Sequence, residues 1–252
     1  MNHKRVRVLK QGTKSKGPVA YWMSRDQRVY DNWALIYSQE VAIETKSPLV
    51  TIFCVTPKFI DATLRQYDFM IKNLKEVQSG LAGKDIPFFV AFGLPEKEIP
   101  AFIKKYDVAL LVTDFDPLRI KKEWKQRVCA NIEIPFHEVD GHNIVPCWIA
   151  SSKQEYGAYT IRPKINRQIA EFLDEFPPLK THPFPWKEKK AFTDWAYIIK
   201  NTEIDRTVMP VDWILPGERA ASENLEDFLS DRIMYYTEHR NNPNKRCLSN
   251  LS

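Results

Sequence analysis

The sequence has few glycines and no glycine-rich phosphate-binding loop. Only 8 of its 252 residues are glycine, and neither G-x-G-x-x-G nor G-x-x-x-x-G-K-[ST] occurs. Both motifs depend on glycines that let the backbone approach the phosphates of a nucleotide. Their absence argues against a dinucleotide-binding or ATP-hydrolysing protein.

Paired cysteines and long hydrophobic segments are also absent. The four cysteines, Cys54, Cys129, Cys147 and Cys247, show no C-x-x-C spacing, so neither a zinc site nor a disulfide framework is predicted. No segment approaches the roughly 18 uninterrupted apolar residues of a membrane span, and the basic N-terminus lacks the apolar region of a signal peptide. We therefore expect a soluble, cytoplasmic protein with reduced cysteines and no membrane partner.

Charge and histidine placement exclude little. The formal charge is +5, with 44% hydrophobic and 27% charged residues, which is a globular composition that permits nucleic-acid binding without requiring it. The five histidines show no metal-ligand spacing, and G-x-S-x-G is absent, so neither a metal site nor a hydrolase-type serine nucleophile is predicted. His142, in the sequence DGHN, is more typical of a turn residue than of a ligand.

Strand-like and helix-like segments alternate through the first 150 residues. Apolar, β-branched runs predict strands at 18–23, 48–55, 86–92, 108–113 and 134–139. The intervening segments predict helices at 31–45, 59–80, 95–106 and from Pro117 onward. Because such alternation is typical of repeated βαβ units, we predict an α/β domain at 17–150 with a five-stranded, parallel, doubly wound sheet. A charged arm without a buried face is predicted at 1–16.

The pattern changes after residue 150. Residues 151–216 are predicted to form a connector, with one helix at 163–176, a proline- and lysine-rich crossing, and an irregular part with room for one short helix. From 217 to 252 a helix begins near Glu218 with a broad apolar face, and a polar loop follows. Either this face packs on the α/β domain, or the rest of a helical domain is missing.

The charged stretch YWMSRDQRVYDNW, at 21–33, joins the first predicted strand to the first helix. In open α/β sheets, ligands bind in the crevice formed by the loops at the carboxyl ends of the strands. The candidate crevice residues are Ser24, Arg25, Asp26 and Asp114. The alternative is an ordinary solvated loop in which Asp31 or Asn32 caps the following helix.

Three long stretches resemble the class II cyclobutane pyrimidine dimer photolyases of the photolyase/cryptochrome family. They are YWMSRDQRVYDNWAL at 21–35, VTDFDPLR at 112–119 running on to HEVDGHNIVPCW at 137–148, and DRIMYYTEHRNNPNKRCLSNLS at 231–252. The resemblance covers essentially the whole chain. It implies an antenna-type α/β domain, a connector, and the first helices of an all-α FAD-binding domain.

The resemblance also implies an activity, namely DNA repair by a flavoprotein lyase. Members of this family use light to pass an electron from reduced FAD to a pyrimidine dimer flipped out of damaged DNA. Some of them also hold an antenna chromophore, often a deazaflavin, against the α/β domain. We expect such a chromophore in the crevice at the carboxyl ends of the strands.

By resemblance, the flavin-contacting positions fall in the last segment. Tyr236 matches the first flavin-contacting position, and Arg240 matches a position near the flavin and the lesion. The loop that receives the flavin diphosphate would be Leu248, Ser249, Asn250, Leu251 and Ser252.

The chain departs from the family in length. Photolyases of this class continue for on the order of 200 further residues, the size of an ordinary domain, and those residues carry the catalytic groups. We therefore expect no catalytic residue here and no activity of the chain alone. Two alternatives stay open: a truncated or split-gene module that binds an antenna chromophore or a separate carboxyl-terminal half, and a cryptochrome-like signalling protein, which the repair-class motifs disfavour.

Overall fold

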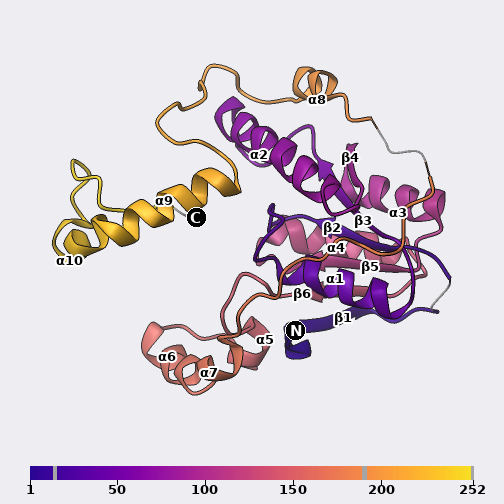
Figure 1. Cartoon of the computed structure of the whole chain (residues 1–252), viewed down its shortest axis with the longest axis horizontal. Coiled ribbons are helices and arrows are strands. Elements are labelled where there is room, and N and C mark those ends of the chain that lie inside the picture. Colours follow the sequence, from indigo (N-terminus) through magenta and orange to yellow (C-terminus); the bar gives the residue numbers. More distant parts are fainter. Residues whose placement is uncertain (14–15, 189–191, 251–252) are drawn as a thin grey trace.

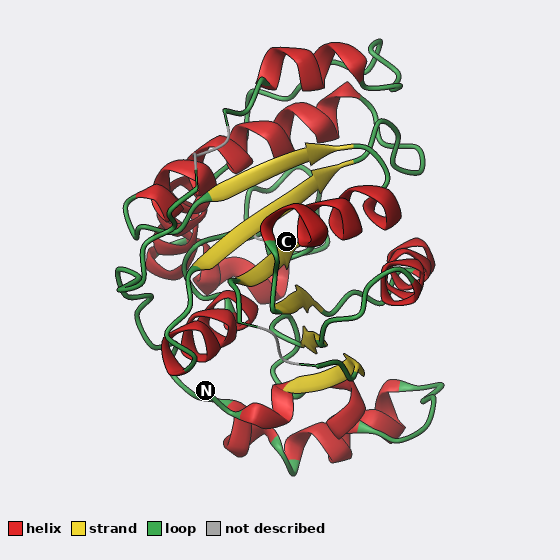
Figure 2. Cartoon of the chain, turned by 90° about the vertical axis from the view of Figure 1, so that its right-hand side faces the viewer, coloured by secondary structure: helices red, strands yellow, loops and turns green. Residues whose placement is uncertain are grey.

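The computed structural model describes residues 1–13, 16–188 and 192–250, and within these ranges six strands form one sheet (Figures 1 and 2). The strands are β1 (Val6–Lys10), β2 (Val19–Met23), β3 (Leu49–Val55), β4 (Phe88–Phe92), β5 (Leu110–Asp114) and β6 (Phe136–Val139). Their order is β1-β6-β5-β2-β3-β4, and every pairing among β2 to β6 is parallel. The predicted α/β class and its five parallel strands are confirmed.

Four helices cover the two faces of the sheet. They are α1 (Trp33–Glu44) and α2 (Leu64–Ala82) on one face, and α3 (Pro95–Tyr106) and α4 (Arg119–Ala130) on the other. Along β2, Tyr21 and Met23 belong to the first core cluster, whereas Ala20 and Trp22 belong to the second. This two-sided burial explains why the strand is apolar at every position.

The amino-terminal segment is not the arm that we predicted. A short 3-10 helix, η1 (His3–Arg5), leads into β1, which pairs antiparallel with β6 and adds a sixth strand at the edge of the sheet. The prediction was wrong because Arg7 and Lys10 made the segment look solvated, whereas charged side chains are normal on an edge strand. Arg5 is even more enclosed, with 2% of its surface exposed.

The connector lies against the α/β domain. The short helix α5 (Cys147–Ala150) precedes it, and its own helices are also short: α6 (Ala158–Asn166), α7 (Ile169–Phe172) and α8 (Trp195–Asn201). The helix predicted at 163–176 therefore begins earlier and is broken after Asn166. Backbone hydrogen bonds from His182 to Lys84 and from Glu203 to Pro57 hold the later part of the connector in place.

The last segment projects away from the sheet (Figure 1). It consists of α9 (Glu218–Ser230), the 3-10 helix η2 (Arg232–Tyr235) and α10 (Tyr236–His239). The carboxylate of Glu218 accepts hydrogen bonds from the backbone N–H groups of Val29 (2.8 Å) and Tyr30 (2.7 Å), so α9 is attached at its first turn. The apolar face beyond it stays exposed, up to 79% at Met234, and does not pack on the α/β domain within the described residues.

Arg5 should be a stability determinant of the amino-terminal strand. Its guanidinium donates hydrogen bonds to four backbone carbonyls, those of Asp140, Asn143, Ile144 and Phe172. Each buried group left without a partner costs about 1–3 kcal/mol, so R5A should lower the free energy of unfolding by about 3 kcal/mol or more in urea titrations.

The neighbouring variant K4A is the matched control for R5A. The Lys4 side chain is 59% exposed and forms an ion pair with Glu171, and such surface pairs contribute at most about 1 kcal/mol. Equal unfolding midpoints for R5A and K4A would contradict the assigned role of Arg5.

Candidate ligand-binding site

A buried carboxylate at the end of β5 holds the loop that follows β2. Oδ2 of Asp114 accepts hydrogen bonds from the backbone N–H groups of Ser24 (2.7 Å), Arg25 (2.9 Å) and Asp26 (3.3 Å). Oδ1 accepts a hydrogen bond from the Tyr21 hydroxyl at 2.5 Å. Burial and the nearby charge of Asp114 raise the pKa of this hydroxyl well above its usual value. Because charge-assisted hydrogen bonds are strong, Asp114 anchors the loop. With 1% of its surface exposed, it is not itself a ligand-contacting group.

Asn32 strengthens the same loop from the side of α1. Its Oδ1 caps the helix by accepting from the N–H of Leu35 at 3.0 Å. Its Nδ2 donates to the carbonyls of Asp26 (2.9 Å) and Arg28 (3.0 Å). The capping interpretation is therefore correct for Asn32, and the loop is also fixed from two sides rather than merely solvated.

A cavity of about 260 Å³, here called the small cavity, opens beside this loop. Its walls come from the carboxyl ends of β2 and β3, the segment 56–62, α2 and the start of α4. Its aromatic and apolar lining includes Phe53, Phe59, Tyr67, Met70 and Trp124, and its polar lining includes Ser24, Arg25, Gln27, Asp116 and Lys121. Of the four predicted crevice residues, Ser24 and Arg25 line the small cavity, whereas Asp26 and Asp114 do not.

Sequence reasoning missed the contribution of α4 to this cavity. The charged stretch RIKKEWKQR of α4 has the composition of a solvated helix face, yet Lys121 and Trp124 both line the cavity. Burial lowers the pKa of Lys121, while Asp116 and Asp114 oppose that shift. The signal was present in the sequence, since the two residues are three positions apart and so lie on one side of a helix.

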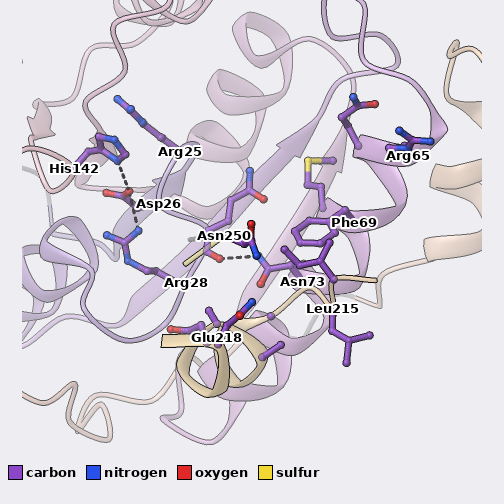
Figure 3. A pocket seen from close by; sticks show the side chains of 18 residues that line it. Arg25, Asp26, Arg28, Arg65, Phe69, Asn73, His142, Leu215, Glu218 and Asn250 are labelled. Atoms are coloured by element: carbon purple, nitrogen blue, oxygen red, sulfur yellow. Dashed lines mark hydrogen bonds and ion pairs between the residues drawn. The ribbon is translucent and has the colours of Figure 1, made fainter. Parts of the chain in front are cut away.

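A larger hollow of about 910 Å³ lies between the same loop, α2 and α9 (Figure 3). It is lined by Arg25, Arg28, Arg65, Phe69 and Leu215, among others, and by Asn250 of the tail. Arg25, Gln27, Gln66 and Met70 line both this large hollow and the small cavity. The two spaces therefore adjoin each other.

Asp26 points into the large hollow between Arg28 and His142 (Figure 3). Its Oδ1 lies 3.2 Å from Nη1 of Arg28 and 4.0 Å from Nδ1 of His142. Burial, followed by the neighbouring charge of Asp114, raises the pKa of Asp26 to about 7, although Arg28 opposes the shift. Asp26 is thus a carboxyl group that exchanges its proton near neutral pH.

Only some of the predicted flavin-binding residues line a common space. Arg240, Leu248 and Asn250 line a third space of about 690 Å³, here called the tail hollow. Tyr236 does not line it, but lies under the guanidinium of Arg240 at 5.8 Å from the ring centroid. Ser249 does not line it either, and Leu251 and Ser252 lie outside the described residues.

The donor set of the tail hollow suits a phosphate-bearing group. Arg240, Lys245 and Arg246 contribute cations, and guanidinium groups match phosphate oxygens in geometry and charge. Arg232 also lines it, but its guanidinium is engaged with the carbonyls of Leu248 (3.0 Å) and Asn224 (2.7 Å). The lining also contains one carboxylate, that of Asp227, which these cations outnumber. The residues present therefore fit the diphosphate part of a flavin dinucleotide, with Arg232 holding the tail against α9.

The described ranges offer neither a metal site nor a membrane-spanning helix. No group of three His, Cys, Asp or Glu side chains there could hold a metal ion. None of the described helices is long and apolar enough to cross a membrane.

The chain folds into a doubly wound α/β domain with a cavity at the carboxyl ends of its strands, the place where open α/β sheets bind ligands. The chain matches the family model "DNA photolyase" over residues 19–183, and it therefore belongs to the DNA photolyase family. It is 43% identical to the deoxyribodipyrimidine photo-lyase of Potorous tridactylus, over 100% of this chain and 48% of that protein. It is 40% identical to the deoxyribodipyrimidine photo-lyase of Arabidopsis thaliana, over 98% of this chain and 53% of that protein. The chain thus spans about half the length of the curated relatives that it matches.

Solved structures agree on the fold. A bacterial class III photolyase from Agrobacterium tumefaciens superimposes with a TM-score of 0.70 at 22% identity, covering 97% of this chain and 50% of that one. A cryptochrome from Synechocystis sp. PCC6803 superimposes with a TM-score of 0.66 at 16% identity, covering 90% of this chain and 50% of the cryptochrome chain. At these identities the likeness establishes the architecture alone.

Replacing Asp114, which anchors the loop after β2, should loosen that loop. In D114N the backbone N–H groups of Ser24 and Arg25 lose a charged acceptor, and hydrogen bonds to charged groups contribute about 1.5–3 kcal/mol. Hydrogen exchange at these two amides should therefore accelerate by about tenfold or more. D31N is the control, since Asp31 is exposed and its positive φ of 51° suits asparagine equally well. Unchanged exchange in D114N would show that the carboxylate is not the anchor.

Asp26 should make stability depend on pH. Its folded pKa of about 7 exceeds the ordinary value of about 3.9, so its favourable contribution is complete below about pH 4 and is lost as the pH rises through about 7. D26N removes this loss. Relative to the wild type, the variant should gain thermal stability between pH 5 and pH 8. A difference in Tm between the two proteins that is the same at both pH values would refute the assignment.

Proposed function

We propose that this chain forms the antenna-bearing half of a class II cyclobutane pyrimidine dimer photolyase. The complete protein would repair pyrimidine dimers in damaged DNA by light-driven electron transfer from reduced FAD. The observation that carries the proposal is the 43% identity to a deoxyribodipyrimidine photo-lyase along the whole of this chain. The assignment to class II is supported by the three sequence stretches at 21–35, at 112–119 with 137–148, and at 231–252.

The tail of the chain would contribute to the flavin site. When bound, reduced FAD would supply the electron that splits the dimer. The cations and amides around the tail hollow would hold its diphosphate, with Arg240 and Asn250 at the hollow. Tyr236, which lies under the guanidinium of Arg240, would contact the flavin. Leu248, Ser249, Leu251 and Ser252 are the further flavin-binding residues of this proposal. The catalytic groups would belong to the half of the relatives that this chain does not span, so the chain alone would be inactive.

The small cavity is the proposed antenna site, with a deazaflavin as its ligand. Pockets for small molecules typically measure about 300–1,000 Å³, and the small cavity, at about 260 Å³, lies just below this range. It would hold the planar ring system, while the side chain of the pigment extends into the adjoining large hollow. Phe59 and Trp124 offer aromatic surfaces to such a ring. Ser24 and Arg25 would contact it, whereas Asp114 would act through the loop that it anchors.

Complementation tests the photolyase proposal. The chain would be co-expressed with the part of the Potorous tridactylus relative that lies beyond the match, and each half would also be produced alone. We expect visible flavin absorption and light-dependent loss of dimers from an irradiated oligonucleotide only with both halves present. Halves that associate and fold yet bind no flavin and repair nothing would contradict the proposal.

A specific observation also favours the second candidate, an antenna-binding module that acts without a flavin. The small cavity is lined entirely by residues between Ser24 and Trp124, so pigment binding should need no other half. Titrating the isolated chain with a deazaflavin, followed by fluorescence quenching, tests this part separately. An unquenched pigment at every protein concentration would refute the antenna site and leave the complementation result to decide the rest.

A further inference from the structure

Lys121 places a cation inside an aromatic cavity. Its Nζ lies 5.1 Å from the ring centroid of Phe59 and 5.0 Å from that of Trp124. It donates a hydrogen bond of 3.1 Å to Oγ of Ser24, on the loop anchored by Asp114. An ammonium group carries three N–H donors, and no second hydrogen-bond acceptor lies within reach among the described residues. Two donors are therefore free to meet a ligand.

The neighbouring carboxylates do not neutralise this ammonium by contact. Asp116 and Asp114 are its acidic neighbours, but neither forms an ion pair with it within 4.0 Å in the described part of the chain. Asp114 holds the loop after β2. Asp116, which lines the same cavity, is engaged through Oδ1, which accepts from the N–H of Leu118 at 2.9 Å. Arg25, which also lines the cavity, adds a second positive charge.

Lys125 lies one turn further along α4 and, unlike Lys121, has a carboxylate partner. Its ammonium forms an ion pair with the fully buried carboxylate of Glu138. Within 4.0 Å, the described part of the chain thus supplies a carboxylate to Lys125 and none to Lys121. Since an enclosed cation without a counter-ion is costly, Lys121 is suited to a counter-ion that arrives with a ligand.

We propose that Lys121 makes the small cavity selective for a planar chromophore with an anionic edge, such as an ionised ring hydroxyl, over its neutral counterpart. The aromatic rings bind the plane of the chromophore, and the ammonium binds the charged edge. This inference rests on the antenna site proposed above. It adds the charge of the ligand and the residue that selects it.

A bound pigment can report on this charge directly. The probe is 8-hydroxy-5-deazariboflavin, whose ring hydroxyl changes the visible spectrum when it ionises. 5-Deazariboflavin, which lacks that hydroxyl, serves as the neutral comparison. The pKa of the bound hydroxyl would be read from the absorption spectrum across a pH series for the wild type and for each variant.

We expect the wild type to lower the pKa of the bound hydroxyl by about one unit or more, which is a tenfold preference for the anion. K121M should abolish most of that shift while still binding 5-deazariboflavin, which shows that the cavity is intact. K121R should keep the shift because it keeps the charge. K122M is the matched control, since Lys122 is the adjacent, exposed lysine of α4, and it should behave as the wild type.

The possible outcomes distinguish a failure of the proposed antenna site from a failure of the role proposed for Lys121. If the wild type binds neither pigment, the antenna site itself fails and this inference fails with it. If wild type and K121M bind the hydroxylated pigment with the same pKa, the antenna site stands and the role of Lys121 is overturned. A K121R variant that behaves like K121M would likewise overturn it, because charge would then not be the property that selects the ligand.

Discussion

The carboxylate of Asp114 is the interaction on which the candidate site depends. It receives three backbone N–H groups and one hydroxyl, and it thereby fixes the path of the loop between β2 and α1. That loop forms one wall of the small cavity and one wall of the large hollow. It also presents Ser24 to Lys121 and the N–H groups of Val29 and Tyr30 to Glu218. The buried carboxylate of Asp114, together with the side chain of Asn32, thus fixes the loop at which the sheet, the cavity and α9 meet.

The α/β domain and the last segment differ in how fully they are packed. The sheet is covered on both faces, and its cavity needs only residues between 24 and 124. In contrast, α9 is attached through its first turn, and the apolar residues Leu225, Leu229 and Met234 stay exposed. A broad apolar face of this kind is normally buried by a partner. The difference agrees with the proposal that pigment binding belongs to this chain and flavin chemistry to an assembly with further residues.

Much of the fold could be predicted from the sequence, because the buried parallel strands are continuous apolar runs and most of the helices repeat apolar residues with a period near 3.6. The continuous apolar run of β2 and the cap at Asn32 were visible in the residues themselves. The edge strand β1 was not, since Arg7 and Lys10 break its apolar pattern and its pairing partner lies about 130 positions away. At the candidate site, the sequence placed Asp114 at the correct edge. It could not reveal that the carboxylate turns inward to the loop, or that Lys121 turns toward the cavity rather than solvent, because both depend on tertiary packing.

Chemical-shift mapping tests the central claim, that an anchored loop and α4 build a pigment site in this chain. The amides of the isotopically labelled protein would be followed during titration with 8-hydroxy-5-deazariboflavin. The account predicts the largest shifts at Ser24, Phe59, Lys121 and Trp124, and small shifts in the tail from Tyr236 to Asn250. Shifts concentrated in the tail, with the loop after β2 unaffected, would contradict it.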